Sequence, residues 1–400
     1  MRREGLGLAL ACGVAAGMHL AHPNREAHKH DVSLPGGVRY AFNADSALFA
    51  RTVERFPRGF WDCEQGKVRI MRPLYSALGR VVYLPLSAVA PLVPDFLASR
   101  VRELKGRTNH PETWADVDER DLLVAWAALV VVNVAVTWLS GFLIVRSLAR
   151  ACSTSEAFVL ALIALFHFDA VDFILVPHSE VFNLLVPAVT LDAVTRGKGT
   201  PEPARATALL LGFLMLGKAL AFPILNWLRG RRLREGVLLL ALFALPGATY
   251  SGLLFVTGLP LYNHEVVVYR QGIWMLDWIR EGRGPAIPLR WGRGLVHHLA
   301  NLALGFAVPL LASLALLLRR ARGRPFPAPW LLPPLAFYGL ACLVFWVVLG
   351  YDPPRLSVLH FPWVLAGLGV AAPRSDRPMF VLVAVAALHL LLRFTGLYDV

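Results

Sequence analysis

Long apolar stretches alternate with short polar breaks along most of this chain. A helix needs roughly 20 apolar residues to cross a bilayer, and runs near that length recur from Leu122 onward. We predict transmembrane helices at 122–145, 157–177, 180–195, 236–258, 294–318, 329–350, 356–372 and 378–393. With the apolar segments 6–21 and 206–228 added, the predicted fold is an all-α polytopic membrane bundle of about ten transmembrane or half-spanning helices.

Composition supports the same fold class. The chain has 400 residues, 56% of them hydrophobic, and a mean hydropathy of +0.54, which excludes an ordinary soluble protein. Four cysteines are scattered along it without a CxxC pair, so they predict no metal site and say nothing about the redox compartment.

The N-terminal segment 1–21 combines a basic start with a short apolar run. This pattern fits either a cleaved secretory signal or an uncleaved signal anchor. We expect an anchor that forms the first span, because a multi-span protein follows it. In both interpretations the next segment lies outside the cytoplasm.

The net charge of +13 is placed in a way that argues against a nucleic-acid partner. Basic residues gather in short breaks between apolar runs, at Arg2 and Arg3, Arg146 and Arg150, Arg196 to Arg205, Arg229 to Arg234, Arg319 to Arg324, and Arg374 and Arg377. The positive-inside rule puts such breaks in the cytoplasm. The protein is therefore expected in the plasma (inner) membrane, in contact with membrane lipids.

This orientation constrains two segments. Segment 75–98 must not cross, and its prolines Pro85, Pro91 and Pro94 favour a broken helix at the outer interface. Segment 206–228 has basic flanks on both sides, so we expect a re-entrant hairpin that turns near Lys218.

A single membrane domain, 1–400, results. Its predicted parts are the anchor 1–21, an outer loop 22–119 with interfacial helices, spans in 120–258, a second outer loop 259–292, and C-terminal spans in 293–400. Arginines at 270, 280, 283, 290 and 293 are unusual for an outer loop, and we interpret them as candidates for binding an anionic ligand.

The outer stretch 43–78 carries the most informative pattern. Apolar residues at helical spacing predict an amphipathic helix on the outer surface: Leu48, Phe49, Val53 and Phe56, together with Thr52. Asp45 at its start is either a helix N-cap or a functional carboxylate. Arg72, at the start of the next apolar stretch, either reaches to lipid headgroups or serves a site.

Five short segments resemble, in the same order, motifs of the GT-C-fold integral membrane glycosyltransferases: Asp45-Ser-Ala-Leu-Phe-Ala-Arg51, Arg72-Pro-Leu-Tyr75, Pro177-His-Ser-Glu180, Leu214-Met-Leu-Gly-Lys-Ala-Leu-Ala-Phe-Pro223 and Arg355-Leu-Ser-Val-Leu-His-Phe-Pro362. The first is similar to a D-E-A-L-Y-A type motif and the second to an R-x-L-Y-P motif. Ser46 replaces an expected acidic residue and Ser76 an expected proline. The resemblance covers roughly residues 5–372.

The resemblance implies an inverting glycosyltransferase with a polyprenyl-phosphate-linked sugar donor and a glycan, lipid or protein acceptor on the outer (periplasmic) side. Asp45 would be the general base. Cations would stabilise the leaving phosphate, and the candidates are Arg72, Lys218 and Arg355. Candidate substrate-binding residues are Tyr75, Glu180, His264 and His360. No cofactor is implied with certainty, and Ser46 leaves the need for a divalent metal open.

Other interpretations remain. Lys218 could reach the membrane surface, and Glu180 could stabilise a helix N-terminus. Asp169 and Asp172 share one helix face and fit a solvated helix end better than a second acidic site. The alternative function is a transporter or flippase for a lipid-linked or polar substrate, and a third is a non-catalytic assembly subunit.

Overall fold

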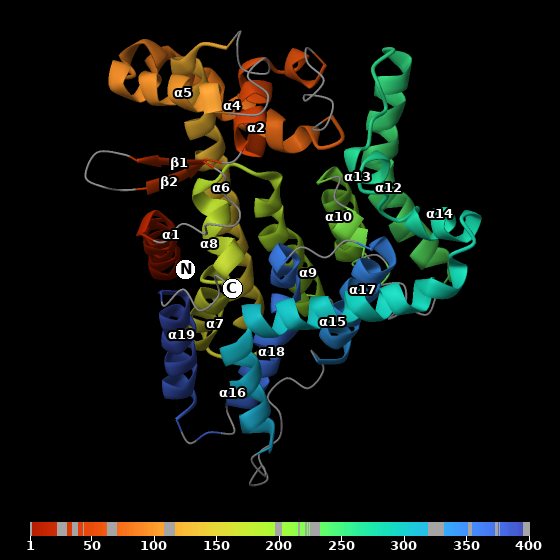
Figure 1. Cartoon of the computed structure of the whole chain (residues 1–400). Helices are drawn as coiled ribbons and strands as arrows, with labels where there is room; N and C mark the ends of the chain where they lie inside the picture. The colour runs from red at the N-terminus through yellow and green to blue at the C-terminus, as the bar shows by residue number, and fades with distance from the viewer. Residues whose placement is uncertain are drawn as a thin grey trace.

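The protein is predominantly helical (Figure 1). The computed structural model describes residues 2–21, 30–33, 39–42, 44–61, 70–107, 117–196, 202–214, 217–220, 222, 224, 233–318, 332–350, 354–372, 375 and 377–394. The elements up to residue 181 are α1 (Arg2–Ala21), β1 (His30–Ser33), β2 (Arg39–Phe42), α2 (Ala44–Glu54), η1 (Arg58–Phe60), α4 (Pro73–Leu86), η2 (Ser87–Leu92), α5 (Asp95–Arg107), α6 (Glu119–Leu148), α7 (Thr154–Leu165), α8 (Phe168–Leu175) and η4 (Ser179–Val181). The later ones are α9 (Phe182–Arg196), α10 (Glu202–Phe213), η5 (Gly217–Leu220), α12 (Leu233–Val256), α13 (His264–Val267), α14 (Trp274–Arg280), η6 (Gly284–Ala286), α15 (Ile287–Gly305), α16 (Ala307–Leu318), α17 (Leu332–Leu349), η8 (Pro354–His360), α18 (Phe361–Ala371) and α19 (Pro378–Phe394).

Helix α6 is the central column, and α2, α4, α7 and α9 pack around it (Figure 1). Its 30 residues give a length of about 45 Å, more than the hydrocarbon thickness of a bilayer. Asp118 starts the helix, because its carboxylate accepts hydrogen bonds from the backbone N–H groups of Arg120 (2.8 Å) and Asp121 (3.3 Å). The predicted span 122–145 is thus confirmed as one continuous helix.

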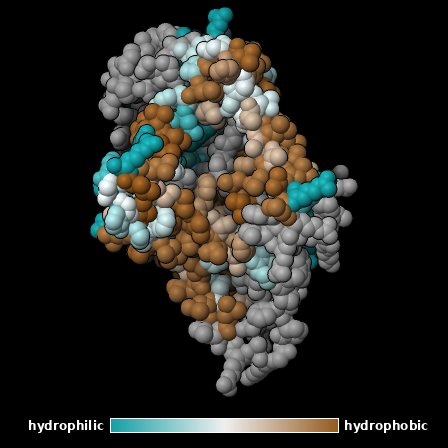
Figure 2. Space-filling model, turned by 90° about the vertical axis from the view of Figure 1, so that its right-hand side faces the viewer, coloured by the Kyte–Doolittle hydropathy of each residue, from teal (hydrophilic) through white to brown (hydrophobic). Residues whose placement is uncertain are grey.

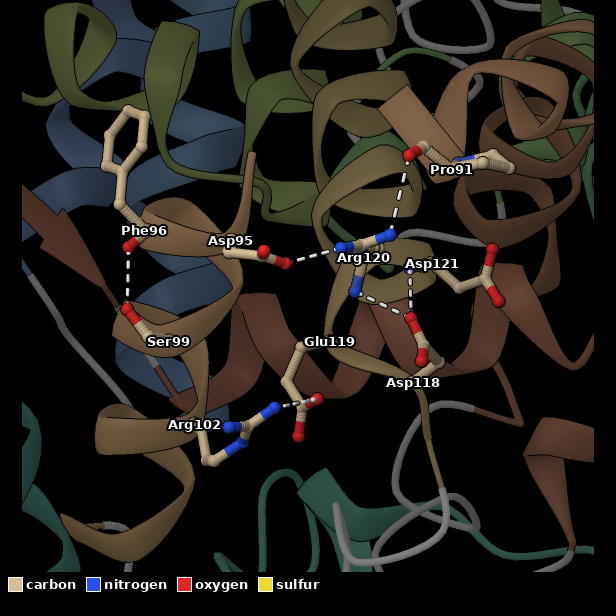
Figure 3. Close-up of polar contacts among 9 residues, drawn as sticks. All are labelled: Pro91, Asp95, Phe96, Ser99, Arg102, Asp118, Glu119, Arg120 and Asp121. Atoms are coloured by element: carbon tan, nitrogen blue, oxygen red, sulfur yellow. Dashed lines mark hydrogen bonds and ion pairs between the residues drawn. The ribbon is translucent and has the colours of Figure 1, made fainter. Parts of the chain in front are cut away.

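The α4–α5 corner breaks where the prolines predict it. The axis from α4 and η2 to α5 bends by 109°, with Pro91 inside η2. Figure 3 shows polar contacts that hold α5 against the start of α6. Arg120 reaches both the Asp95 carboxylate and the Pro91 carbonyl oxygen, and Arg102 pairs with Glu119 at 3.3 Å. The prolines mark the break, and ion pairs at the exposed rim hold α5 beside the start of α6.

The predicted spans 157–177 and 294–318 are each formed by two helices rather than one, and whether either crosses a membrane stays a prediction. Segment 157–177 breaks between α7 and α8 at His167, whose Nε2 lies 3.1 Å from Ser357 Oγ. Segment 294–318 bends by 87° between α15 and α16. A Cβ at Gly305 would lie 2.5 Å from His167 Nε2 and 2.9 Å from Ser357 Oγ. The missing side chain lets the bend close onto this polar contact.

Helices α10 and α12 form a tight pair. A Cβ at Gly212 would lie 2.3 Å from the carbonyl oxygen of Phe243, so only glycine allows this approach. Arg205 and Glu235 join the pair through two hydrogen bonds of 3.0 and 2.8 Å. Within the predicted hairpin 206–228, α10 ends at Phe213 and η5 follows, which is a helix break. Whether this segment enters and leaves a membrane on one side stays a prediction.

One element departs from an all-α fold. Strands β1 and β2 pair antiparallel beside the N-terminal region, with His30 opposite Phe42 and Ser33 opposite Arg39 (Figure 1). Both strands lie in the predicted outer loop 22–119, for which interfacial helices were expected. The strands have four residues each, β2 contacts α1, and the pair leaves the class of the fold unchanged.

The described residues contain two helices long and apolar enough to cross a membrane, Glu119–Leu148 and Leu233–Val256, or up to four if each of two bent pairs is one span. Many large apolar side chains are exposed, among them Val81, Val237 and Phe380. Figure 2 shows a mainly hydrophobic face with hydrophilic residues toward its upper part and edges. Apolar helices that could span a membrane are thus present, while the bundle of about ten spans remains a prediction.

Candidate functional site

Three of the sequence motifs meet against α6. The ring of Phe49, in α2, lies edge-to-face with Tyr75 of α4 at 4.9 Å and with His178 at 5.7 Å between centroids. Arg72, which precedes α4, donates a hydrogen bond from Nη1 to Ser179 Oγ at 3.3 Å. Segments that begin at 45, 72 and 177 therefore form one cluster, here called the α2–α4–η4 cluster.

Helix α2 lies at the centre of this cluster and is almost entirely buried. Every residue from Ser46 to Val53 is at most 5% exposed. The predicted apolar face is confirmed at Leu48, Phe49 and Val53, but the expected exposed face is missing. α2 is an internal helix, so the prediction that it lies on the outer surface as an amphipathic helix was wrong.

Arg80 closes the C-terminal end of α2. Its Nη1 donates to the carbonyl oxygens of Val53 (3.2 Å) and Glu54 (2.5 Å). The last carbonyls of a helix have no partner within the helix and carry partial negative charge, so a guanidinium there is favourable. This contact fixes α2 along α4 and thereby sets where the first turn of α2 lies.

A single polar residue of α6 connects the other two segments. Tyr75 donates its hydroxyl hydrogen to Asn133 Oδ1 at 2.7 Å, and Asn133 Nδ2 donates to the carbonyl oxygen of Val176 at 3.1 Å. Tyr75 is 1% and Asn133 0% exposed. Tyr75, predicted to bind substrate, is thus buried and joins α4 to α6. Asn133 was not among the predicted site residues, although an amide within an apolar run is a usable signal.

The third part of the α2–α4–η4 cluster is the Ser179–Glu180 pair. Ser179 and Glu180 lie in the short helix η4 and are buried, with 1% and 7% exposure. Asn183 Nδ2 donates to Glu180 Oε2, and the backbone N–H of Glu180 donates to His178 Nδ1 at 3.2 Å. A buried carboxylate oriented by an amide is suited to accept hydrogen bonds from sugar hydroxyls.

Three predicted residues have side chains outside the described part of the structure. The backbone places Asp45 in the first turn of α2, which begins at Ala44, so Asp45 is not the residue preceding the helix. Lys218 lies in η5 and Arg355 in η8. The convergence of these side chains with Arg72 stays a prediction, as does the catalytic role of Asp45.

Two predicted histidines lie elsewhere. His264 starts α13, and its Nδ1 lies 3.1 Å from the Tyr262 hydroxyl. His360 is buried at the end of η8, where its Nε2 lies 2.7 Å from His298 Nε2 and its Nδ1 accepts a hydrogen bond from Trp363 Nε1 at 2.9 Å. Because Nδ1 is an acceptor, a neutral His360 donates from Nε2 to His298. Both remain candidates for binding substrate.

Other acidic and histidine residues give no metal site among the residues that the structure describes, where no group of three or more potential ligands occurs. Asp172 is 6% exposed, which contradicts its interpretation as a solvated helix end. The possible metal requirement of the predicted reaction stays open, since the side chain of Asp45 is outside this part of the chain.

Comparison with known proteins yields no family, no curated protein and no solved structure that matches this chain. Support for a function therefore comes only from the sequence motifs and from the geometry of the α2–α4–η4 cluster. This cluster brings together the Arg72 guanidinium, the buried Ser179–Glu180 pair and α2, the helix whose first turn carries Asp45.

Proposed function

We propose that this protein is a membrane glycosyltransferase of the GT-C type, which moves a sugar from a polyprenyl-phosphate-linked donor to an acceptor outside the cytoplasm. The observation that carries the proposal is the contact of Arg72 with Ser179 across 107 positions of sequence. It joins two segments that resemble motifs of this family, and Phe49 of a third such segment packs on both. The upper half of the face in Figure 2 is hollowed, as a substrate site requires.

The chemistry follows from these residue types. Asp45 takes the proton of the acceptor hydroxyl, and the resulting oxygen attacks the anomeric carbon from the side opposite the phosphate. The new glycosidic bond forms as the bond from the anomeric carbon to the phosphate oxygen breaks. The electron pair leaves on the lipid phosphate, and the proton remains on Asp45.

Cations beside the leaving phosphate provide the second part of the catalysis. Negative charge on the phosphate grows in the transition state, so a fixed cation stabilises it there more than in the ground state. Arg72 is suited to this role because its planar guanidinium binds two phosphate oxygens at once. The Ser179 contact holds it in position, and Lys218 and Arg355 are the further candidates.

A transporter or flippase is the second candidate, and one observation favours it. His298–His360 and His167–Ser357 are polar contacts inside the helical core, and their members come from three separate regions of the chain. Buried titratable groups of this kind line substrate or proton paths in transporters. A purified protein that binds lipid-linked sugars but transfers none would favour this alternative.

The test compares Asp45→Asn with Lys218→Met in purified protein, using polyprenyl-phosphate hexoses and pentoses with a radiolabelled sugar. Asp45→Asn keeps the shape but cannot take a proton, so turnover should fall about 10²–10⁴-fold while donor binding is kept. Lys218→Met removes a phosphate contact and should weaken donor binding as well.

The matched control is Asp118→Asn, because asparagine also caps a helix well and Asp118 lies at the start of α6. This variant should retain parental turnover. If Asp45→Asn protein folds and transfers sugar at the parental rate, Asp45 is not the base and the proposed mechanism is wrong.

A further inference from the structure

Two arginines, Arg283 after α14 and Arg290 in the first turn of α15, lie against one indole ring of α14. The guanidinium carbon of Arg283 is 4.2 Å and that of Arg290 4.9 Å from the centroid of Trp278. Arg290 also lies 4.2 Å from the centroid of Trp274. These four residues are called the tryptophan–arginine site. Stacking on aromatic rings stabilises a guanidinium without neutralising its charge.

The indole rings form a fixed base for the site. Trp274 is 3% exposed and donates from Nε1 to the carbonyl oxygen of Val348 at 2.9 Å. Gly350 follows with φ +70°, and a Cβ there would lie 2.5 Å from Trp274 Nε1. Trp278 meets Trp274 edge-to-face at 5.3 Å. The arginines therefore rest on a rigid platform attached to the end of α17.

The charges around the platform are unbalanced. Asp277 is engaged by Arg270 through two hydrogen bonds of 2.7 and 2.8 Å. Glu281 makes a single contact of 3.3 Å with Arg283, with both side chains exposed. Within the described residues Arg290 makes no ion pair. Two guanidinium groups that contact one ring repel each other, so an anion beside them is favourable. A phosphate group suits them, because guanidinium groups bind its oxygens in pairs.

The surroundings indicate that this phosphate belongs to a lipid. Leu276, Ile279 and Leu289 are 55%, 59% and 60% exposed on the same segment. Leu276 and Ile279 belong to α14 and Leu289 to α15, the two helices that carry Trp274, Trp278 and Arg290. A free phosphate would gain nothing from these side chains, whereas acyl chains would cover them.

We propose that the tryptophan–arginine site binds the phosphate of an anionic membrane phospholipid, with its acyl chains over the apolar residues of α14 and α15. Binding would neutralise part of the arginine charge that is unusual for an outer loop. The proposal is independent of sugar transfer, since none of the four residues belongs to the α2–α4–η4 cluster.

The experiment titrates the detergent-solubilised protein with dioleoylphosphatidylglycerol or dioleoylphosphatidylcholine and measures bound lipid by native mass spectrometry. The parent should prefer the anionic lipid. The double variant Arg283→Gln/Arg290→Gln should lose at least about tenfold in affinity for it, because two charge-assisted contacts are removed. Inorganic phosphate should not compete at equal concentration.

The matched control is Arg280→Gln/Arg293→Gln, which removes the same charge from two exposed arginines of the same segment that make no indole contact among those described. It should bind the anionic lipid as the parent does. Equal loss in both double variants would mean general charge attraction and would overturn the site.

A single variant and a competition measurement complete the test. Arg283→Gln alone changes an exposed side chain and should fold normally; unchanged affinity in this variant also overturns the proposal. Competition with a polyprenyl monophosphate identifies the lipid class. If the polyprenyl lipid displaces phosphatidylglycerol at lower concentration, the site serves the polyprenyl lipid and the assignment to a membrane phospholipid is wrong.

Discussion

The carboxylate of Glu54 lies where α2 ends, is half-buried and contacts Arg55 at 3.2 Å. Burial disfavours the charged form and raises the pKa of Glu54 above its ordinary value, with the nearby Asp121 acting in the same direction and Arg55 opposing it. A raised pKa means that the folded state holds this proton more tightly than the unfolded state. The contribution of Glu54 to stability is therefore greatest below its unfolded pKa and is lost as pH rises through the folded pKa.

Glu54→Gln is expected to remove this dependence, since glutamine resembles the protonated acid at every pH. Thermal unfolding in detergent, measured at pH 4 and pH 7.5, should show the variant gaining stability relative to the parent at the higher pH. Measuring the parent at both values corrects for all other titrating groups. A difference between variant and parent that is the same at both pH values would contradict the prediction.

Individual residues were predictable from the sequence where burial follows from spacing. Leu48, Phe49 and Val53 recur at helical intervals and are buried in α2. The partners of polar residues were not predictable: a lone Asn133 within an apolar run indicates an internal contact but not that Tyr75 provides it. Hydrogen bonds between distant segments depend on how helices pack, which local patterns do not specify.

At the scale of elements, Gly79 sets the distance between α4 and its neighbours. A Cβ there would lie 2.6 Å from Leu129 Cδ2 of α6 and 2.6 Å from Val53 Cγ2 of α2. Real contacts of this kind are not that short, so the absence of a side chain lets three helices meet. The α2–α4–η4 cluster depends on this junction, because Arg72 and Tyr75 lie at the start of α4.

Gly79→Ala should therefore lower the stability of the protein by about 1–3 kcal/mol, the usual cost of an overpacked core. It should also reduce sugar transfer, because α4 would move away from α2. Thermal unfolding in detergent checks the first effect. Gly252→Ala in α12 is the control, since no atom lies within 4 Å of the added Cβ, and its stability should be unchanged or slightly higher. Equal destabilisation in both variants would contradict a tight junction at Gly79.

Helix breaks were predictable only where the sequence marks them. Pro91 lies within the corner between α4 and α5, and the corner occurs as expected. Pro309 likewise lies four residues after Gly305, where it cannot donate to the Gly305 carbonyl oxygen, so the bend between α15 and α16 was also marked in the sequence. The break at His167 has no proline in α7 or α8, and His167 contacts Ser357, which lies far away in sequence. Hydropathy alone treats such broken pairs as continuous spans, because it averages over the residues at the break.

At the scale of the whole molecule, few helices in the described part of the chain reach the length that a full crossing needs. α9 has 15 residues, α18 has 11 and α19 has 17. These lengths fall below the roughly 20 residues that a full crossing needs. Short and bent helices of this kind can surround a polar site at membrane depth, where they satisfy one another's backbone groups. The predicted orientation of the chain then depends on which segments cross fully.

Single cysteines introduced into a cysteine-free background test this orientation. The sequence predicts labelling from outside at 24–70 and 262–290, and only from inside at 229–235 and 319–325. Arg58, Asn263 and Arg234 are exposed positions in three of these segments and suit replacement by cysteine. A membrane-impermeant maleimide on intact cells should label the first two. Labelling of Arg234→Cys from outside would mean that 206–228 crosses fully, which contradicts the re-entrant hairpin and would place Lys218 away from the side on which Asp45 is expected to act.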